Sequence, residues 1–309
     1  MDRERPTENE AHPRFLQVVY SGPDALVASP ITRTILMACV LVFAGEVVAS
    51  HSLQALVRVS TPVALAFGAN EPDLVLKLGQ TDRLLASCFA HTSLFHLFIN
   101  MYTLRQVGPL VEPEVGSARY STLFVVTGIA GSLTSALLGR LLGHHGFTVG
   151  ASGAICGVMG AAVVVWARVE GWRSWIAWQI GFWLAVTLVL GARLPGIDNA
   201  AHVGGLMSGS LMALAWRREV IPPARTAWIV GIASAFCVAA GLRVAWRDRT
   251  DPAAMLDLDQ RIHLVQLALD RGDCVTALEG MEMAEELGQG AELAGLRKAV
   301  EQKCGPPGP

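Results

Sequence analysis

Long runs of apolar residues, separated by short polar stretches, occupy most of the chain up to about residue 250. A membrane-spanning helix needs about 20 apolar residues to cross roughly 30 Å of hydrocarbon. The pattern therefore predicts seven spans, at about residues 34–50, 92–108, 119–141, 152–168, 174–192, 201–216 and 226–242. The connection 51–83 is broken by Pro62 and Pro72, and we expect it to form short amphipathic helices in the membrane interface. The predicted fold class is all-α, a polytopic membrane helical bundle.

The last part of the chain, 251–309, is more charged and has apolar residues at helical spacing. Breaks at 272–273 and 288–290 predict three short helices. The stretch from Leu267 to Leu287 resembles one tetratricopeptide-type hairpin, which would offer a surface to a protein partner. Stable arrays usually need three or more repeats, so a small helical tail without a partner is an equally good interpretation. The sequence leaves open whether Cys274 and Cys304 pair.

The composition agrees with a membrane protein. Hydrophobic residues make up 52% of the chain and charged residues 16%, whereas soluble domains carry about 25% charged residues. These values exclude intrinsic disorder and a small disulfide-stapled secreted module. A net charge of −2 gives no basic face for a nucleic acid. No cluster of side chains has metal-ligand spacing, so we expect neither a metal nor an organic cofactor.

Lysine and arginine residues are more frequent on the side of the membrane that holds the N-terminal segment 1–33. The positive-inside rule then places this segment in the cytoplasm, and seven crossings place the C-terminus outside. Arg243, Arg247 and Arg249, after the last span, run against this trend without reversing it. About thirty polar residues precede the first span, so no cleavable signal peptide is predicted.

Ser152 lies between glycines where the fourth predicted span begins, in the sequence Gly150-Ala-Ser-Gly-Ala-Ile-Cys-Gly157. The free N–H groups of a first helical turn would surround its hydroxyl and could hold a developing negative charge. Gly153 and Gly157 also form a small-xxx-small pair, which is typical of a packing contact between membrane helices. The motif alone therefore fits either a nucleophile or a packing seam.

His202 opens the sixth span, with Gly205 and Gly209 following at helical spacing. Alone it could be a structural group or a proton relay. If the glycine faces of the fourth and sixth spans meet, Ser152 and His202 lie at similar depth, and a hydroxyl beside an imidazole is a nucleophile with its base. Glu46 and Asp198 are the nearest carboxylates by topology, and we assign neither a catalytic role.

His96 and Asn100 lie four residues apart in the second span and therefore share one helix face. Both can donate hydrogen bonds and would suit an oxyanion site. A polar lock between helices is the alternative interpretation. His91, a further turn toward the membrane surface, is interpreted as structural.

The three motifs, Gly-x-Ser-Gly, Ala-His-x-x-Gly-x-x-x-Gly and His-x-x-x-x-His-x-x-x-Asn, lie on the fourth, sixth and second spans. In this combination the chain resembles the rhomboid family of intramembrane serine proteases. The resemblance covers about residues 34–217 and implies a six-helix protease core there. Residues 218–250 would then hold a C-terminal seventh span with its flanks, the six-plus-one arrangement of some members. Residues 251–309 would be an extramembrane helical tail.

The resemblance implies that Ser152 is the nucleophile and His202 the general base. It also implies that His96 and Asn100 hold the oxyanion together with the Ser152 N–H. Arg83 matches the arginine of the family's Trp-Arg motif, with Asp82 in place of the tryptophan. Cys156 stands where the family often has a tyrosine that packs on the histidine. We expect this smaller side chain to bring a modest loss of activity or a compensating neighbour.

The implied substrates are membrane-anchored proteins, cut in or near their transmembrane segments after entering from the lipid bilayer between the second and fifth spans. The aromatic residues Trp175, Trp178, Phe182 and Trp183 of the fifth span fit such a gate, and they equally fit a lipid-facing surface. The alternative function is that of a catalytically inactive rhomboid-like protein that binds membrane proteins. The expected location is the inner membrane of a bacterium, with the active site opening to the extracytoplasmic side.

Overall fold

The computed structural model describes residues 26–142, 146–194, 196–216, 221–250, 258–287 and 291–305. Most of the predicted N-terminal segment, up to residue 25, lies outside this range, as does the second predicted break of the tail at 288–290. In the described part the regular secondary structure is helical, apart from one isolated antiparallel bridge between Asn70 and Thr148. The predicted all-α bundle is confirmed.

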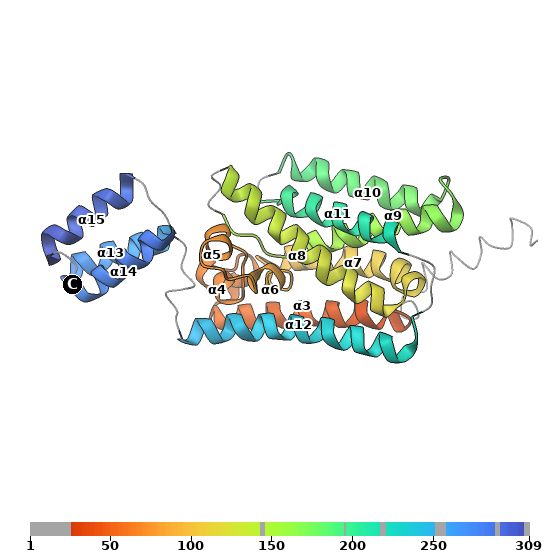
Figure 1. Cartoon of the computed structure of the whole chain (residues 1–309), viewed down its shortest axis with the longest axis horizontal. Helices are drawn as coiled ribbons and strands as arrows, with labels where there is room; N and C mark the ends of the chain where they lie inside the picture. Colours follow the sequence, from red (N-terminus) through yellow and green to blue (C-terminus); the bar gives the residue numbers. More distant parts are fainter. Residues whose placement is uncertain are drawn as a thin grey trace, which may run out of the picture.

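Seven long helices stand where the seven spans were predicted (Figure 1): α3 (Pro30–Ala49), α7 (Leu94–Val115), α8 (Ser117–Leu141), α9 (Ser152–Glu170), α10 (Trp175–Gly191), α11 (Asn199–Ala215) and α12 (Pro223–Thr250). Of these, α3, α8, α9 and α12 are long and apolar enough to cross a membrane, and α10 is a shorter apolar helix. The helix α7 carries a polar motif, and α11 carries another and is also short. Hydropathy and length alone therefore do not identify these two helices as membrane spans. The connection before α7 forms short helices: η1 (Leu53–Leu56), α4 (Thr61–Ala66), α5 (Pro72–Leu76) and α6 (Arg83–Ala86).

Two helices continue beyond the apolar runs that predicted them. α7 passes through Pro109 and Pro113 and ends before Gly116, whose φ of 80° lies in the left-handed region that favours glycine. α12 continues to Thr250 because arginine is a good helix former and its positive charge is favourable near a helix C-terminus. The apolar runs of these two spans therefore end at polar residues, whereas the helices continue.

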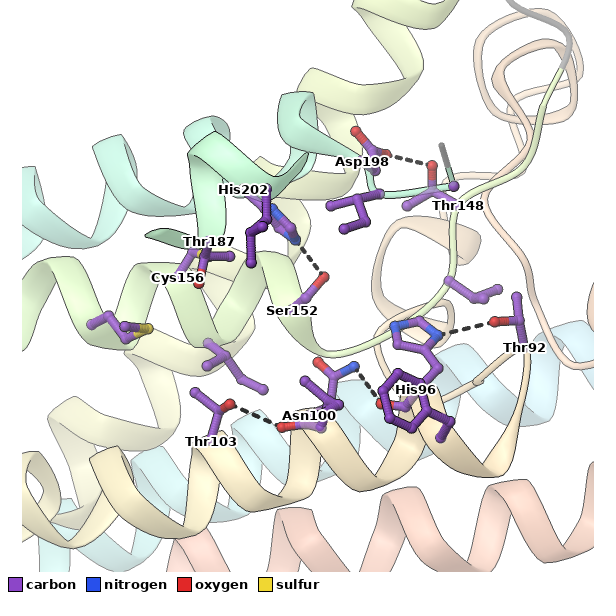
Figure 2. A pocket seen from close by; sticks show the side chains of 18 of the residues that line it. Thr92, His96, Asn100, Thr103, Thr148, Ser152, Cys156, Thr187, Asp198 and His202 are labelled. Carbon is purple, nitrogen blue, oxygen red and sulfur yellow. Dashed lines mark hydrogen bonds between the residues drawn. The ribbon is translucent and has the colours of Figure 1, made fainter. Parts of the chain in front are cut away.

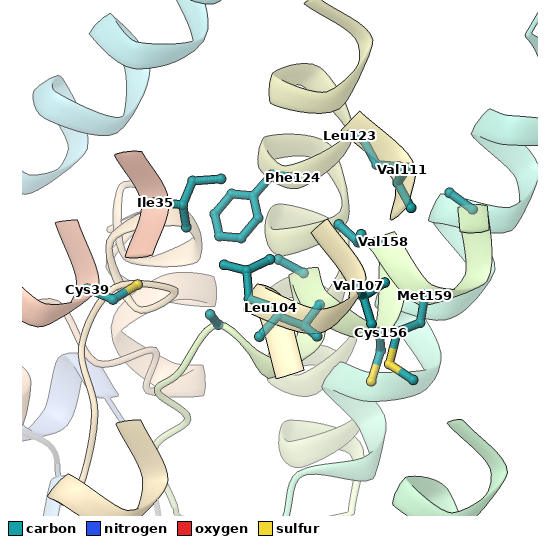
Figure 3. Packing of buried hydrophobic residues seen from close by; sticks show 14 of the residues in the cluster. Ile35, Cys39, Leu104, Val107, Val111, Leu123, Phe124, Cys156, Val158 and Met159 are labelled. Atoms are coloured by element: carbon teal, nitrogen blue, oxygen red, sulfur yellow. The ribbon is translucent and has the colours of Figure 1, made fainter. Parts of the chain in front are cut away.

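The helix that begins at Ser152, α9, lies at the centre of the bundle. In its most apolar window 61% of the residues are buried, against 11% in α12, which packs on the outside against α6 and α8. The core between α3, α7, α8 and α9 is filled by apolar side chains, including the aromatic ring of Phe124 (Figure 3). The central position of α9 means that its first turn is held from several sides.

Glu112, near the end of α7, anchors the beginning of α3. Its buried carboxylate accepts hydrogen bonds from the Ile31 N–H at 2.9 Å, the Thr32 N–H at 2.8 Å and the Thr32 hydroxyl at 2.8 Å. The Ser117 hydroxyl also donates to it, at 2.9 Å. The first N–H groups of a helix have no partner within the helix, and a negative charge there is favourable. Glu112 therefore supplies hydrogen-bond acceptors inside the bundle for the first N–H groups of α3.

The tail consists of α13 (Leu258–Arg271), α14 (Cys274–Leu287) and α15 (Ala291–Cys304), as the pattern predicted. The three helices share an apolar cluster of their own, which includes Val265, Ala277 and Val300. Cys274 and Cys304 form a disulfide, which answers the question that the sequence left open. The disulfide joins the beginning of α14 to the end of α15.

Replacing Glu112 by alanine should destabilise the protein, because the N-terminal groups of α3 would remain buried without an acceptor. We expect Glu112→Ala to lower the free energy of unfolding by about 3 kcal/mol. The exposed neighbour Glu114 on the same helix is the matched control. Glu114→Ala should change the free energy of unfolding by no more than about 0.5 kcal/mol. Denaturant titration in detergent micelles measures both, and equal losses would contradict the anchoring role of Glu112.

Candidate active site

Ser152 and His202 contact each other at the beginnings of two neighbouring helices. Ser152 is the first residue of α9, and His202 lies in the first turn of α11. The Ser152 Oγ and the His202 Nε2 are 2.9 Å apart, a hydrogen-bond distance (Figure 2). His202 is only 4% exposed. The structure thus brings together the hydroxyl and the imidazole that the sequence placed on separate spans.

Glycines make this contact geometrically feasible. A Cβ added to Gly205 would lie 1.9 Å from the carbonyl oxygen of Gly153, and one added to Gly209 would lie 2.1 Å from that of Gly157. Real Cβ atoms do not approach a carbonyl oxygen so closely, so only glycine fits at either position. The glycine faces of α9 and α11 therefore meet, Gly205 on Gly153 and Gly209 on Gly157. At these two positions the backbones of the two helices touch directly.

His96 and Asn100 bring a third helix, α7, to the same place. The Nδ1 of His96 lies 3.1 Å from the Thr92 hydroxyl, and the Asn100 amide donates to the His96 carbonyl at 2.9 Å (Figure 2). The other side of the His96 ring faces Gly150, where an added Cβ would lie 2.7 Å from Nε2. Gly150 has a φ of 113°, which favours glycine and lets the backbone pass close beneath the ring on its way to Ser152.

A cavity of about 420 Å³ opens beside Ser152. Its walls come from α7, α9, α10, the beginning of α11 and the loops that precede α9 and α11. The lining includes His96, Asn100, Ser152, Cys156, Thr187 and His202. Most of the remaining lining is apolar, for example Phe95, Ile155 and Met159. All four residues that the sequence singled out for chemistry therefore face one shared space.

Asp198 connects the two segments that carry Ser152 and His202. Its carboxylate accepts a hydrogen bond from the Ala201 N–H at 3.0 Å, which caps α11 one turn before His202. It also accepts from the Thr148 hydroxyl at 2.6 Å and from the Ser135 hydroxyl. Thr148 lies in the loop just before Ser152, so one carboxylate positions both segments. An aspartate directly before a helix is a common N-cap, and this signal could have identified Asp198 from the sequence.

In the part of the chain that the structure describes, no carboxylate bonds to the far side of the His202 ring. Among the described residues, the Nδ1 of His202 has no hydrogen-bond partner. Glu46 is fully buried on α3 and accepts a hydrogen bond from the His91 N–H at 3.1 Å. The described residues also include no group of three or more His, Cys, Asp or Glu side chains placed to hold a metal.

His91 lies outside the cavity lining, behind His96. Its ring is buried, its Nδ1 lies 3.1 Å from the Phe89 carbonyl, and its edge meets the His96 ring at a centroid distance of 5.1 Å. Burial, with the His96 ring adding to the effect, lowers the pKa of His91 to about 3, so its ring is neutral near pH 7. A neutral ring in this place supports His96 by packing.

Arg83 and Cys156 differ in their relation to the site. Arg83 is fully buried away from the cavity and donates to the Leu65 and Ala69 carbonyls, both at 2.9 Å, so it ties the loop before α7 together. Cys156 lines the cavity one turn after Ser152, with 2% of its surface exposed. The space that a larger residue would fill there remains part of the cavity.

Comparison with known proteins identifies a domain in the part of the chain that carries the candidate site. The rhomboid domain family matches residues 78–219, the part that contains Arg83, His96, Asn100, Ser152 and His202. RHOMBOID-like protein 1 of Arabidopsis thaliana is 33% identical over 153 residues, which is 47% of this chain and 37% of that protein. Rhomboid protease GluP of Bacillus subtilis is 33% identical over 157 residues, which is 50% of this chain and 30% of that protein.

Rhomboid-like protease 1 of Toxoplasma gondii is 29% identical over 163 residues, which is 51% of this chain and 54% of that protein. The chain covers less than two thirds of the length of each of these relatives. Residues 78–219 of the chain match a rhomboid domain. Its apolar helices and this domain match support a multi-pass membrane protein.

The contact between α9 and α11 should not tolerate even one methyl group. We expect Gly205→Ala to lower the free energy of unfolding by about 1–3 kcal/mol, because the added carbon must push the two backbones apart. The control is Gly231→Ala on α12, where nothing lies within 4 Å of an added Cβ, and we expect no loss there. Equal stability of the two variants in a denaturant titration would show that the helices can separate freely.

Proposed function

We propose that the chain is an intramembrane serine endopeptidase that cleaves membrane-anchored proteins in or near their transmembrane segments. The observation that carries this proposal is the 2.9 Å contact between the Ser152 Oγ and the His202 Nε2 beside a cavity in a rhomboid domain. A hydroxyl is a weak nucleophile until an adjacent base can take its proton. The contact supplies that base, and the cavity supplies the space for a peptide.

In the proposed reaction, His202 accepts the Ser152 proton at Nε2 as the Ser152 oxygen attacks the peptide carbonyl. The tetrahedral intermediate then carries its negative charge on the former carbonyl oxygen. His202 returns the proton to the leaving amine as the C–N bond breaks, which leaves an acyl-enzyme. Water, deprotonated by His202, attacks the acyl carbon and releases the second product and the Ser152 hydroxyl.

The oxyanion is proposed to lie between the first turn of α9 and the polar side chains of α7. The Ser152 N–H belongs to a helical first turn, whose N–H groups have no partner within the helix. His96 and Asn100 face the cavity from the opposite wall. Donors that are already in place when the charge develops stabilise the transition state without reorganising. The hydrogen bonds of His96 with Thr92 and of Asn100 with the α7 backbone hold both side chains in position.

This mechanism uses two catalytic side chains, Ser152 and His202. Asp198 is assigned to positioning, because its carboxylate is occupied by Thr148, Ser135 and the α11 backbone. The orientation of the His202 ring would then come from packing and from its bond to Ser152.

A transmembrane segment is the proposed substrate because the cavity is largely apolar and lies between α7 and α10. Phe95 and Ile99 line it from α7, and Thr187 and Leu190 line it from α10. A segment that arrives from the bilayer between these two helices would meet Ser152 directly. The aromatic residues Trp178, Phe182 and Trp183 of α10 are 59–69% exposed, which fits contact with lipid as well as a gate.

The proposed orientation places the N-terminus in the cytoplasm, and the cavity and the C-terminal tail on the opposite side. The end of α12 contacts α6 through Arg247 and Asp82, so the chain leaves the bundle on the side where α9 begins. The Cys274–Cys304 disulfide supports an extracytoplasmic tail, because disulfides persist in oxidising compartments and are rare in the cytosol.

Ser152 and His202 should both be required for cleavage of a model transmembrane substrate in proteoliposomes. We expect no cleavage by Ser152→Ala or His202→Ala, and no labelling of Ser152→Ala by a fluorophosphonate probe. His96→Ala and Asn100→Ala should each lower kcat by about 10²–10³-fold, the usual effect of losing an oxyanion donor.

The matched control for these variants is Ser208→Ala, because the Ser208 hydroxyl donates to the Gly204 and Gly205 carbonyls of its own helix. Its activity should equal that of the unmodified protein. Labelling that persists in Ser152→Ala would refute the assignment of the nucleophile. A protein that binds the substrate without any Ser152-dependent cleavage would instead be a non-cleaving rhomboid-like factor.

A reporter that is active only outside the cytoplasm should give a signal when it is fused after residue 250. The same reporter inserted at residue 172, between α9 and α10, should give none, because this loop lies on the opposite side of the bundle. We expect this orientation because arginine is unevenly distributed between the two sides, and loops rich in arginine tend to stay in the cytoplasm. The reverse pattern of signals would invert the proposed orientation.

A further inference from the structure

Asp82 and Arg247 form a two-pronged ion pair that joins α6 to the last turns of α12. The Nη1 of Arg247 donates to Oδ2 of Asp82 at 2.9 Å, and its Nη2 donates to Oδ1 at 2.9 Å. Only 7% of the Asp82 side chain and 12% of the Arg247 side chain are exposed. Paired, nearly parallel hydrogen bonds of this kind fix geometry as well as charge. The pair therefore sets where α6 lies relative to α12.

The same pair belongs to a buried polar cluster in the loop before α7. The Gln80 side-chain oxygen accepts from Arg247 Nη1 at 3.3 Å and from Arg83 Nε at 2.6 Å. Arg83 in turn holds the Leu65 and Ala69 carbonyls. Arg247 thus connects α12 to the Gln80–Arg83 cluster of this loop.

Apolar contacts accompany the ion pair. Leu85 and Ala86 of α6 share a small buried cluster with Ala240 and Val244 of α12. Gly68 lies in the same place, since a Cβ added to it would lie 2.6 Å from Ala86 and 3.4 Å from Val244. α12 therefore covers one side of α6, and the ion pair fixes the register of that contact.

The residue after α6, Ser87, reaches the candidate active site through the backbone. Its carbonyl accepts a hydrogen bond from the Gly150 N–H at 2.8 Å, and its hydroxyl lies 3.3 Å from that of Ser132 on α8. Gly150 is the residue that lies against the His96 ring, two positions before Ser152. A displacement of α6 would therefore move the backbone that presents both the nucleophile and the His96 contact.

We propose that Arg247 is a positioning residue for Ser152, acting through Asp82, α6 and the Ser87–Gly150 hydrogen bond. The seventh helix is thereby part of the machinery that aligns the site, although it contributes nothing to the cavity lining. The inference rests on the proposed proteolytic function. It also accounts for Asp82, which stands where the related motif has tryptophan: a buried carboxylate needs the cation that α12 provides.

The test is a double-mutant cycle with Asp82→Asn, Arg247→Gln and both together, in the full chain in proteoliposomes. Each single variant should lower kcat roughly tenfold and change KM less than about twofold, because the site is misaligned while the substrate still enters. The double variant should lose no more than either single variant, since both remove the same interaction. Arg247→Lys, which keeps the charge but not the paired hydrogen bonds, should lie between Arg247→Gln and the unmodified protein.

Arg243→Gln is the matched control, because Arg243 lies one turn earlier on α12, 3.8 Å from Asp82 and 68% exposed. It should retain full activity. A second readout does not depend on activity: hydrogen–deuterium exchange over residues 146–156 should be faster in Arg247→Gln than in Arg243→Gln, because the Gly150 N–H is less well held.

A purely structural role would lower the unfolding temperature and leave kcat per folded molecule unchanged, and that result would overturn the proposal. Additive losses in the cycle, or unchanged exchange at 146–156, would also overturn it. If the unmodified protein shows no Ser152-dependent cleavage, the proposed function fails by itself. The exchange measurement would then still decide whether Arg247 holds the segment that carries Gly150.

Discussion

Direct contact between the backbones of α9 and α11 is the constraint on which the rest of the structure depends. In a bilayer no hydrophobic force draws one apolar helix to another, so association relies on close packing and buried hydrogen bonds. Gly205 on Gly153 and Gly209 on Gly157 provide that packing. Because both helices begin at the same side, their contact places the Ser152 hydroxyl against the His202 ring. Any side chain between these helices would remove the contact.

A buried polar group without a hydrogen-bond partner costs free energy, and the other buried polar side chains provide such partners. The Glu112 carboxylate accepts hydrogen bonds from the first turn of α3. The Asp198 carboxylate accepts them from the first turn of α11 and from the Thr148 hydroxyl. Arg83 donates hydrogen bonds to carbonyls of the loop before α7, and Arg247 forms an ion pair with Asp82. Each of these groups joins segments that are distant in sequence. The polar residues therefore fix how the helices are arranged, and the apolar residues fill the space between them.

The helices and the principal site residues could be predicted because their signals are local. Apolar runs mark the spans, and the spacing of glycines around Ser152 and His202 marks two faces that can meet. The contacts of Glu112 with α3 and of Asp82 with Arg247 could not be predicted in this way, since they join residues 80 or more positions apart. The extension of α7 beyond residue 108 was missed because Glu112 and Glu114 interrupt the apolar pattern while the helix continues. The Cys274–Cys304 pairing was open because sequence alone does not give the distance between the two residues.

A seam made of glycine has a consequence for entropy. Glycine has no rotamers, so α9 and α11 lose no side-chain freedom at Gly153, Gly157, Gly205 and Gly209, where their backbones touch. The two helices should therefore behave as one stiff unit, and the distance from the hydroxyl to the imidazole should vary little with temperature or lipid. Structural variation would then be concentrated in the helices that surround this unit, α7 and α10, whose larger side chains can change rotamer.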